Sequence, residues 1–166
     1  MKAIIIGNAG SGKSTLSSEV QLRQHVALLS LDEVAFKTGA VRRPIDESIA
    51  EVKRFIDKNQ SWIIEGCYSD IITGVLDHCE ELVFLNPGVD KCIAHCRARL
   101  WEPGKFESIE EQNENLENLI DWVRQYETRS DEYGLARHRA IYESFQGRKF
   151  ELKEPSQYNN WINLRI

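Results

Sequence analysis

A short segment near the start of the chain combines residue types that bind phosphate. The segment GNAGSGKST covers residues 7–15, and within it Gly7, Gly12, Lys13 and Ser14 complete the pattern G-x-x-x-x-G-K-[ST]. In loops of this pattern, backbone N–H groups and the positive end of the following helix form a concave anion site. The lysine ammonium reaches the β and γ oxygens, and the serine hydroxyl ligates Mg²⁺. The pattern predicts a nucleoside triphosphate site made of Gly7, Asn8, Ala9, Gly10, Ser11, Gly12, Lys13, Ser14 and Thr15.

The elements on either side of this segment are those that the pattern requires. Residues 2–6 are an apolar run and are expected to form a short buried strand, and residues 13–24 a helix that begins where the glycines end. Glycine in a structured region is conformationally costly, so three glycines within residues 7–12 indicate a backbone that must approach another group closely. We expect that group to be the polyphosphate, which side chains would block.

Strands and helices alternate along the rest of the chain. Further strands are expected at 25–32, 61–65, 81–87 and 148–152. Further helices are expected at 45–59, 70–78 and 90–101. Another is expected to begin at Ser108, which forms a capping box with Glu111, and a last one is expected from Ser130 to 145. Such alternation indicates βαβ units around a parallel sheet that is covered on both faces. We expect one domain over 1–166, in which the last ten residues stay ambiguous.

Composition and charge exclude several classes of protein. The 166 residues, 42% of them hydrophobic and 28% charged, are typical of a soluble globular domain. No window approaches the roughly 18 apolar residues of a membrane span, so we expect a cytoplasmic protein without a membrane partner. The net charge is −5 and residues 107–118 contain five glutamates and no base, which disfavours direct contact with nucleic acid.

The cysteines of a chain with this expected location are more often thiols than disulfides. We therefore expect Cys67, Cys79, Cys92 and Cys96 to be reduced. Cys92 and Cys96 lie four residues apart on one helical face, but no second ligand pair with zinc-like spacing follows them. We interpret this pair as core thiols, without a metal.

With these segments the chain resembles the small P-loop kinases, the group that contains adenylate, shikimate and gluconate kinases. Within the group it is most similar to the adenylate-kinase-related proteins named DNA topology modulation proteins. The likeness spans most of the chain and rests on the phosphate loop, on LLSLDEVAF, WIIEGCY and VFLNP, and on arginines in the segment that follows. It implies a three-layer P-loop NTPase fold, with a five-stranded parallel sheet of order 2-3-1-4-5 flanked by helices. It also implies a helical lid at about 101–130 and the use of ATP and Mg²⁺.

The resemblance also implies roles for acidic residues at the ends of strands. Glu65 takes the position of the acid that holds water on the magnesium ion, together with the Ser14 hydroxyl. Asp32 matches the acid that touches the acceptor or its metal; the alternatives are a helix N-cap and a solvated loop residue. The family often has an arginine shortly after Glu65, whereas here Tyr68 is followed by Ser69 and Asp70.

Arginines complete the set of residues that the resemblance implies. In RSDEYGLARHRAIY, Arg129 and Arg139 match the lid arginines, with Arg137 as the alternative to Arg139. Arg97 and Arg99 resemble arginines that stack on adenine or enter the lid. A guanidinium suits these roles because its planar fork binds phosphoryl oxygens in pairs, although a surface ion pair is an equal alternative for each. The expected catalytic residues are thus Lys13, Asp32, Glu65, Arg129 and Arg139.

Two functions are compatible with these residues. The first is an ATP-dependent phosphotransferase that moves the γ-phosphoryl group to a small acceptor. Arg42 and Arg43 precede the helix at 45–59, where nucleotide kinases bind the acceptor's phosphate, which favours an anionic acceptor; a solvated charge pair explains them equally well. The second function is a nucleotide-dependent regulatory or binding protein with little or no turnover. The identity of the acceptor, the choice between ATP and GTP, and the oligomeric state do not follow from the sequence.

Overall fold

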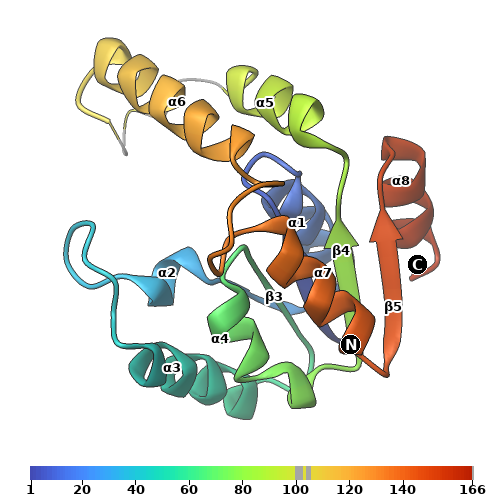
Figure 1. Ribbon diagram of the computed structural model, residues 1–166. Helices are drawn as coiled ribbons and strands as arrows, with labels where there is room; N and C mark the ends of the chain where they lie inside the picture. Colours follow the sequence, from blue (N-terminus) through green and yellow to red (C-terminus); the bar gives the residue numbers. More distant parts are fainter. Residues whose placement is uncertain (100–102, 104–105, 166) are drawn as a thin grey trace.

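The apolar run before the glycines is the central strand of a parallel sheet. β1 (Lys2–Gly7) pairs in parallel with β3 (Trp62–Gly66) on one side and with β4 (Glu81–Leu85) on the other. β2 (Ala27–Ser30) and β5 (Arg148–Leu152) form the edges, so that the order is β2-β3-β1-β4-β5 (Figure 1). The predicted five-stranded parallel sheet of order 2-3-1-4-5 is confirmed.

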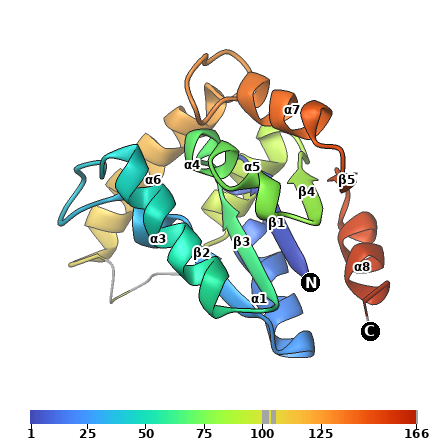
Figure 2. The same cartoon turned by 90° about the horizontal axis from the view of Figure 1, so that it is seen from below.

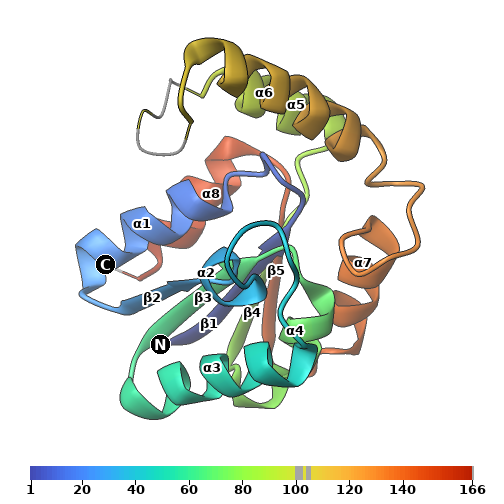
Figure 3. The same cartoon turned by 90° about the vertical axis from the view of Figure 1, so that its left-hand side faces the viewer.

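Two helices cover one face of this sheet. The computed structural model describes residues 1–99, 103 and 106–165. In it, α1 (Lys13–Gln24) and α8 (Pro155–Asn163) lie side by side on the face from which Ile5 projects (Figure 3). Leu16 and Trp161 are almost fully buried there. The helix predicted at 13–24 is confirmed at both ends.

Three helices cover the opposite face. α3 (Ile45–Lys58), α4 (Ser69–Thr73) and α7 (Leu135–Ser144) pack against the side chains of Ile4 and Ile6 (Figure 2). Successive strand residues project to opposite faces, so the four residues from Ala3 to Ile6 supply both cores and are all fully buried. Short helical turns, α2 (Asp32–Ala35) and the 3₁₀ turn η1 (Leu76–His78), complete the connections.

A helix pair lies beyond the carboxyl ends of the strands. α5 (Val89–Arg97) and α6 (Ile109–Arg124) pack together around a third cluster that contains Cys92, Cys96 and Val123 (Figure 3). All four cysteines are free thiols, and the described residues contain no group of three or more His, Cys, Asp or Glu side chains that could hold a metal ion. The interpretation of Cys92 and Cys96 as core thiols is confirmed.

The predicted lid at about 101–130 coincides with this helix pair only in part. α6 lies inside it, whereas residues 100–102 and 104–105 are outside the described part of the chain. The Ser108 hydroxyl accepts the N–H of Glu111 at 3.0 Å, as predicted, but the Glu111 carboxylate accepts the N–H of Glu107 instead of closing the box. No helix within the described residues has the length and apolar character needed to cross a membrane.

Several helices differ from the sequence prediction: the one expected at 70–78 is divided into α4 and η1, and the one expected at 90–101 ends at Arg97. The helix expected from Ser130 begins only at Leu135, because the Asp131 carboxylate accepts the backbone N–H of Tyr133 and holds 129–134 as a loop. The ambiguous C-terminal residues contribute to α8, which starts with Pro155. Its start is fixed by a capping box in which Glu154 and Gln157 exchange hydrogen bonds.

His138, on α7, forms hydrogen bonds to two distant parts of the chain. Its ring is fully buried, Nδ1 lies 2.8 Å from the Tyr126 hydroxyl, and Nε2 lies 2.9 Å from the carbonyl oxygen of Cys67. The carbonyl can only accept, so Nε2 carries the proton and Nδ1 accepts from the hydroxyl. Burial lowers the pKa of His138 to about 4, so the ring is neutral at pH 7.

Stability should fall when acid protonates His138. The folded pKa of about 4 lies below the ordinary value of 6.5, so the unfolded chain binds more protons between these values. The contribution of His138 to the free energy of unfolding is complete above pH 6.5 and is lost on acidification. The loss is about 2 kcal/mol between pH 7 and pH 5. Urea unfolding at both pH values should show this loss, and His138→Gln should reduce the pH dependence. The exposed His78→Gln is the control, and an equal slope in wild type and His138→Gln would contradict the account.

Candidate functional site

The phosphate loop has the backbone that its glycines permit. Gly10 and Gly12 adopt φ values of +77° and +97°, which other residues rarely adopt. A Cβ at Gly7 would lie 2.5 Å from the carbonyl oxygen of Leu85, and one at Gly10 would lie 2.3 Å from that of Cys92. The expectation that the glycines serve only the approach of phosphate is therefore incomplete, because Gly7 and Gly10 are required where the loop packs against β4 and α5.

The carbonyl groups of the loop are directed toward donors of the protein. The Lys13 ammonium donates to the Asn8 carbonyl oxygen at 2.7 Å. His95 Nδ1, on α5, lies 2.7 Å from the Gly10 oxygen and must carry a proton, since a carbonyl only accepts. The Tyr158 hydroxyl, on α8, donates to the Ser11 oxygen at 3.1 Å.

This arrangement leaves N–H groups available on the inner side of the loop. No acceptor among the described residues pairs with the backbone N–H of Gly12, Lys13 or Ser14, which open α1. The buried side-chain atoms Asn8 Oδ1 and Ser11 Oγ also lack a partner within the described chain. A helix start with unpaired N–H groups next to an ammonium has the chemistry that binds phosphate.

A pair of oxygen donors adjoins the loop, at the positions expected for Mg²⁺. The Ser14 hydroxyl is exposed and lies 3.3 Å from Oε1 of Glu65, which is buried at the end of β3. β1 and β3 are neighbours, with Ile5 in register with Glu65, so the topology brings the two together. Hydroxyl and carboxylate oxygens are the ligands that Mg²⁺ prefers, so the residues present fit the ion.

Asp32 lies two residues after the end of β2, as the first residue of α2, and is exposed to solvent. Leu31 occupies the N-cap of α2, so the N-cap alternative for Asp32 does not hold. Its Oδ1 accepts the Tyr68 hydroxyl at 2.5 Å. Burial and this hydrogen bond raise the pKa of Tyr68, which therefore stays protonated and donates to a carboxylate.

The two predicted lid arginines form ion pairs with carboxylates of the protein. Arg129 forms an ion pair with Asp131 at 2.9 Å and stacks 4.3 Å from the centre of the Trp122 ring. Arg139 donates through both Nη atoms to Glu151 at 2.8 Å. This bidentate contact lowers the pKa of Glu151 to about 2.

The remaining arginines of the prediction differ in their contacts. Arg137, the alternative second lid arginine, is exposed and forms no ion pair with any described residue. Arg97 pairs with Glu117 of α6 at 3.0 Å, and Arg99 is exposed after the end of α5. The structure thus brings Lys13, Ser14 and Glu65 together, and places the arginines in ion pairs or in solvent.

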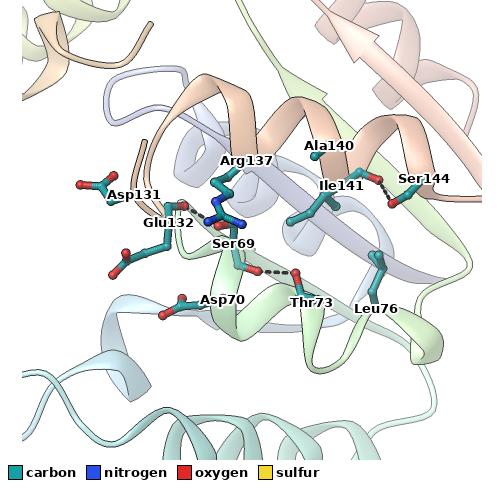
Figure 4. Close-up of a pocket in the computed structure, with 10 residues that line it drawn as sticks. All are labelled: Ser69, Asp70, Thr73, Leu76, Asp131, Glu132, Arg137, Ala140, Ile141 and Ser144. Atoms are coloured by element: carbon teal, nitrogen blue, oxygen red, sulfur yellow. Dashed lines mark hydrogen bonds between the residues drawn. The ribbon is translucent and has the colours of Figure 1, made fainter. Parts of the chain in front are cut away.

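A cavity lies away from the residues of the phosphate loop. It measures about 640 Å³, within the range of small-molecule sites, and is formed between α4 and α7 (Figure 4). Ser69, Asp70 and Glu132 line one end of it, and Arg137 extends toward them from α7. None of its lining residues belongs to the loop.

His95 and Tyr158 are the functional residues that sequence reasoning missed. His95 is the neighbour of Cys96, which the sequence indicates only as a core thiol, and Tyr158 lies in the C-terminal segment that stays ambiguous in the sequence. Each meets the loop through tertiary packing, 85 and 147 residues away from its partner. The only local signal for Tyr158 was Pro155 with Gln157, which indicates the start of a helix.

The phosphate loop and the parallel sheet of order 2-3-1-4-5, with helices on both faces, define a P-loop NTPase fold. No protein-family model matches the chain, and no curated protein matches it. Among solved structures, the shikimate kinase from Bacteroides thetaiotaomicron is similar with a TM-score of 0.58 and 16% identity, over 98% of this chain and 95% of that one. The shikimate kinase from Aquifex aeolicus vf5 is similar with a TM-score of 0.53 and 16% identity, over 99% and 94%. These likenesses show the fold.

The hydrogen bond from Tyr158 should help to hold the loop ready for phosphate. We expect Tyr158→Phe to weaken binding of ADP with Mg²⁺ by about 5-fold, the cost of one hydrogen bond of about 1 kcal/mol. Isothermal titration calorimetry measures this directly. Tyr142→Phe, on α7, is the matched control, and unchanged affinity in Tyr158→Phe would mean that α8 does not support the loop.

Proposed function

We propose that the protein is an ATP-dependent phosphotransferase that moves the γ-phosphoryl group to a hydroxyl of a small molecule. The observation that carries the proposal is the loop itself, whose carbonyl groups are bound by donors while the N–H groups of Gly12, Lys13 and Ser14 stay available. The adjoining Ser14 and Glu65 oxygens supply the ligands for a metal ion. The likeness of the fold to shikimate kinases supports the same class of reaction.

The mechanism assigns one task to each residue near the loop. The backbone N–H groups bind the β and γ phosphates, and the Lys13 ammonium exchanges its contact with the Asn8 carbonyl for phosphate oxygens. Ser14 and Glu65 would hold Mg²⁺, which, when bound, neutralises charge on the phosphates. The acceptor hydroxyl forms the new P–O bond as the bond to the ADP oxygen breaks, and Asp32 takes the hydroxyl proton.

The proposed roles of Arg129 and Arg139 require a change of partner. Each guanidinium would have to leave its carboxylate, Asp131 or Glu151, to meet phosphoryl oxygens. Arg137 needs no such exchange, because it is exposed and forms no ion pair with a described residue. Closure of the lid over bound nucleotide is the event in which these arginines would act.

The same ion pairs favour one alternative function. A protein whose candidate catalytic arginines are held by its own carboxylates has the features of a nucleotide-dependent regulator that turns over slowly or not at all. The two functions differ in one measurement, the rate of ADP formation with and without acceptor. A jump on addition of the acceptor supports the phosphotransferase, and binding of ATP with no jump for any acceptor supports the regulator.

Removal of the Lys13 ammonium should abolish turnover. Lys13→Ala is expected to reduce ADP formation by 10³-fold or more, on the order of the charge stabilisation lost in the transition state. Far-UV circular dichroism should stay that of the wild type. Lys53→Ala, an exposed lysine of α3, is the control. Normal turnover in Lys13→Ala would show that the loop does not bind the reacting phosphates.

The metal role of Glu65 predicts a split between two assays. Glu65→Gln should lower Mg²⁺-dependent turnover by roughly 10- to 100-fold, as expected for loss of a group that holds the metal shell. Nucleotide binding in the presence of EDTA should change much less, because the N–H groups and Lys13 remain. Equal losses in both assays would indicate that Glu65 is structural.

A further inference from the structure

Asp32, to which the proposed mechanism gives the hydroxyl proton, opens the four-residue helix α2 and is exposed to solvent. Among the described residues, the Tyr68 hydroxyl is the one group that donates a hydrogen bond to its carboxylate, at 2.5 Å from Oδ1. An exposed carboxylate rotates about its χ angles, and fixing it costs conformational entropy. The hydrogen bond from Tyr68 is therefore the contact that holds Asp32 in one orientation.

The ring of Tyr68 is itself held from several sides. The residue is 4% exposed, and the rings of Phe36 and Tyr133 meet it edge to face, with ring centres 6.2 and 5.4 Å away. The guanidinium carbon of Arg42 lies 5.0 Å from the centre of the Tyr68 ring and 5.8 Å from the centres of the other two. Edge-to-face pairs and cation–π contacts have preferred geometries, so these neighbours restrict the direction of the ring.

Arg42 is held in turn by contacts within the chain. Its Nη2 donates to Asp70 at 3.0 Å, and its Nη1 donates to the Tyr133 hydroxyl. An antiparallel bridge joins Arg42 to Phe36, so two neighbours of the Tyr68 ring belong to one short folded segment. The guanidinium is thus paired with a carboxylate, and in this arrangement it supports the packing of Tyr68.

The backbone is attached on both sides of Tyr68. The carbonyl oxygen of Cys67 accepts the Nε2–H of the buried His138, on α7, at 2.9 Å. The N–H and the hydroxyl of Ser69 both donate to the carbonyl oxygen of Glu132, at 3.2 and 2.6 Å (Figure 4). The segment that follows β3 is therefore fixed to α7 and to the loop before it, and Tyr68 lies between the two attachments.

The hydroxyl of Tyr68 serves as a donor. Burial and the hydrogen bond to Asp32 raise the pKa of Tyr68, so the hydroxyl keeps its proton. With Oδ1 of Asp32 occupied by this donor, Oδ2 has no hydrogen-bond partner among the described residues and is left for an incoming hydroxyl. A base that is oriented by a third group is the usual arrangement where a hydroxyl must be activated.

We propose that Tyr68 is a positioning residue, which holds Asp32 in the orientation that takes the proton of the acceptor hydroxyl. The inference rests on the proposed phosphotransferase function and adds a residue to it. The hydroxyl oxygen of the acceptor bonds to the γ-phosphorus, and the P–O bond to ADP breaks with its electrons leaving on ADP. The proton goes to Oδ2 of Asp32, while Tyr68 keeps its own proton and acts only through Asp32.

A double-mutant cycle tests whether Tyr68 acts through Asp32. ADP formation is measured with ATP, Mg²⁺ and either water or the member of a panel of sugars, polyols and nucleosides that stimulates the wild type most. Tyr68→Phe should lower kcat by about 10-fold, which is part of the roughly 10²-fold loss expected for Asp32→Asn. In the Asp32→Asn background, Tyr68→Phe should change kcat by less than about 2-fold, because the base that it orients is absent.

The KM for ATP separates positioning from damage to the nucleotide site. It should stay within about 2-fold of the wild type in every variant, because the loop N–H groups and Lys13 remain. Tyr133→Phe is the matched control, since it removes a neighbouring hydroxyl that bonds to Arg42 and keeps the ring against Tyr68. It should leave kcat unchanged, and thermal unfolding should show that each variant is folded.

Three results would overturn the positioning role and leave the phosphotransferase intact. These are a normal kcat in Tyr68→Phe, an equal loss in Tyr133→Phe, and a loss from Tyr68→Phe that is as large in the Asp32→Asn background as in the wild type. If the wild type binds ATP and forms no ADP with water or with any member of the panel, the proposed function fails and the inference falls with it.

Discussion

The rest of the site depends on the direction of three carbonyl groups in the phosphate loop. Lys13, His95 and Tyr158 bind the carbonyl oxygens of Asn8, Gly10 and Ser11 from within the loop, from α5 and from α8, respectively. Of the N–H groups in the same peptides, that of Ser11 donates to the Asn8 oxygen at 3.2 Å, whereas that of Gly12 has no acceptor among the described residues. The sheet supplies the remaining constraint, because parallel strands end at one edge and so gather side chains from distant parts of the sequence.

This constraint also explains how much could be predicted from the sequence. The loop and the strand before it follow from a local pattern, and the proximity of Ser14 to Glu65 is implied by the family resemblance; the structure has all three. The loop at 129–134 could not be predicted, because a side chain there competes with the helix for backbone N–H groups. His95 and Tyr158 were missed because their contacts are made only once α5 and α8 have packed on the loop.

The contacts of the arginines could not be predicted from the sequence either. A sequence shows that a guanidinium is present, but not which carboxylate it meets. Arg139 and Arg42 differ little in sequence terms from arginines that bind substrate, yet one is held by Glu151 and the other by Asp70 and three rings. Their availability to a ligand is set by tertiary contacts.

The backbone amide spectrum of the loop tests the central claim most directly. In a ¹H–¹⁵N correlation spectrum of the whole protein, ADP with Mg²⁺ should move the amide signals of Gly12, Lys13 and Ser14 most, because phosphate oxygens become their acceptors. Signals on the far side of the molecule, such as those of η1, should stay in place. Saturable binding of ADP with the largest shifts elsewhere, and with these three amides unmoved, would contradict the account.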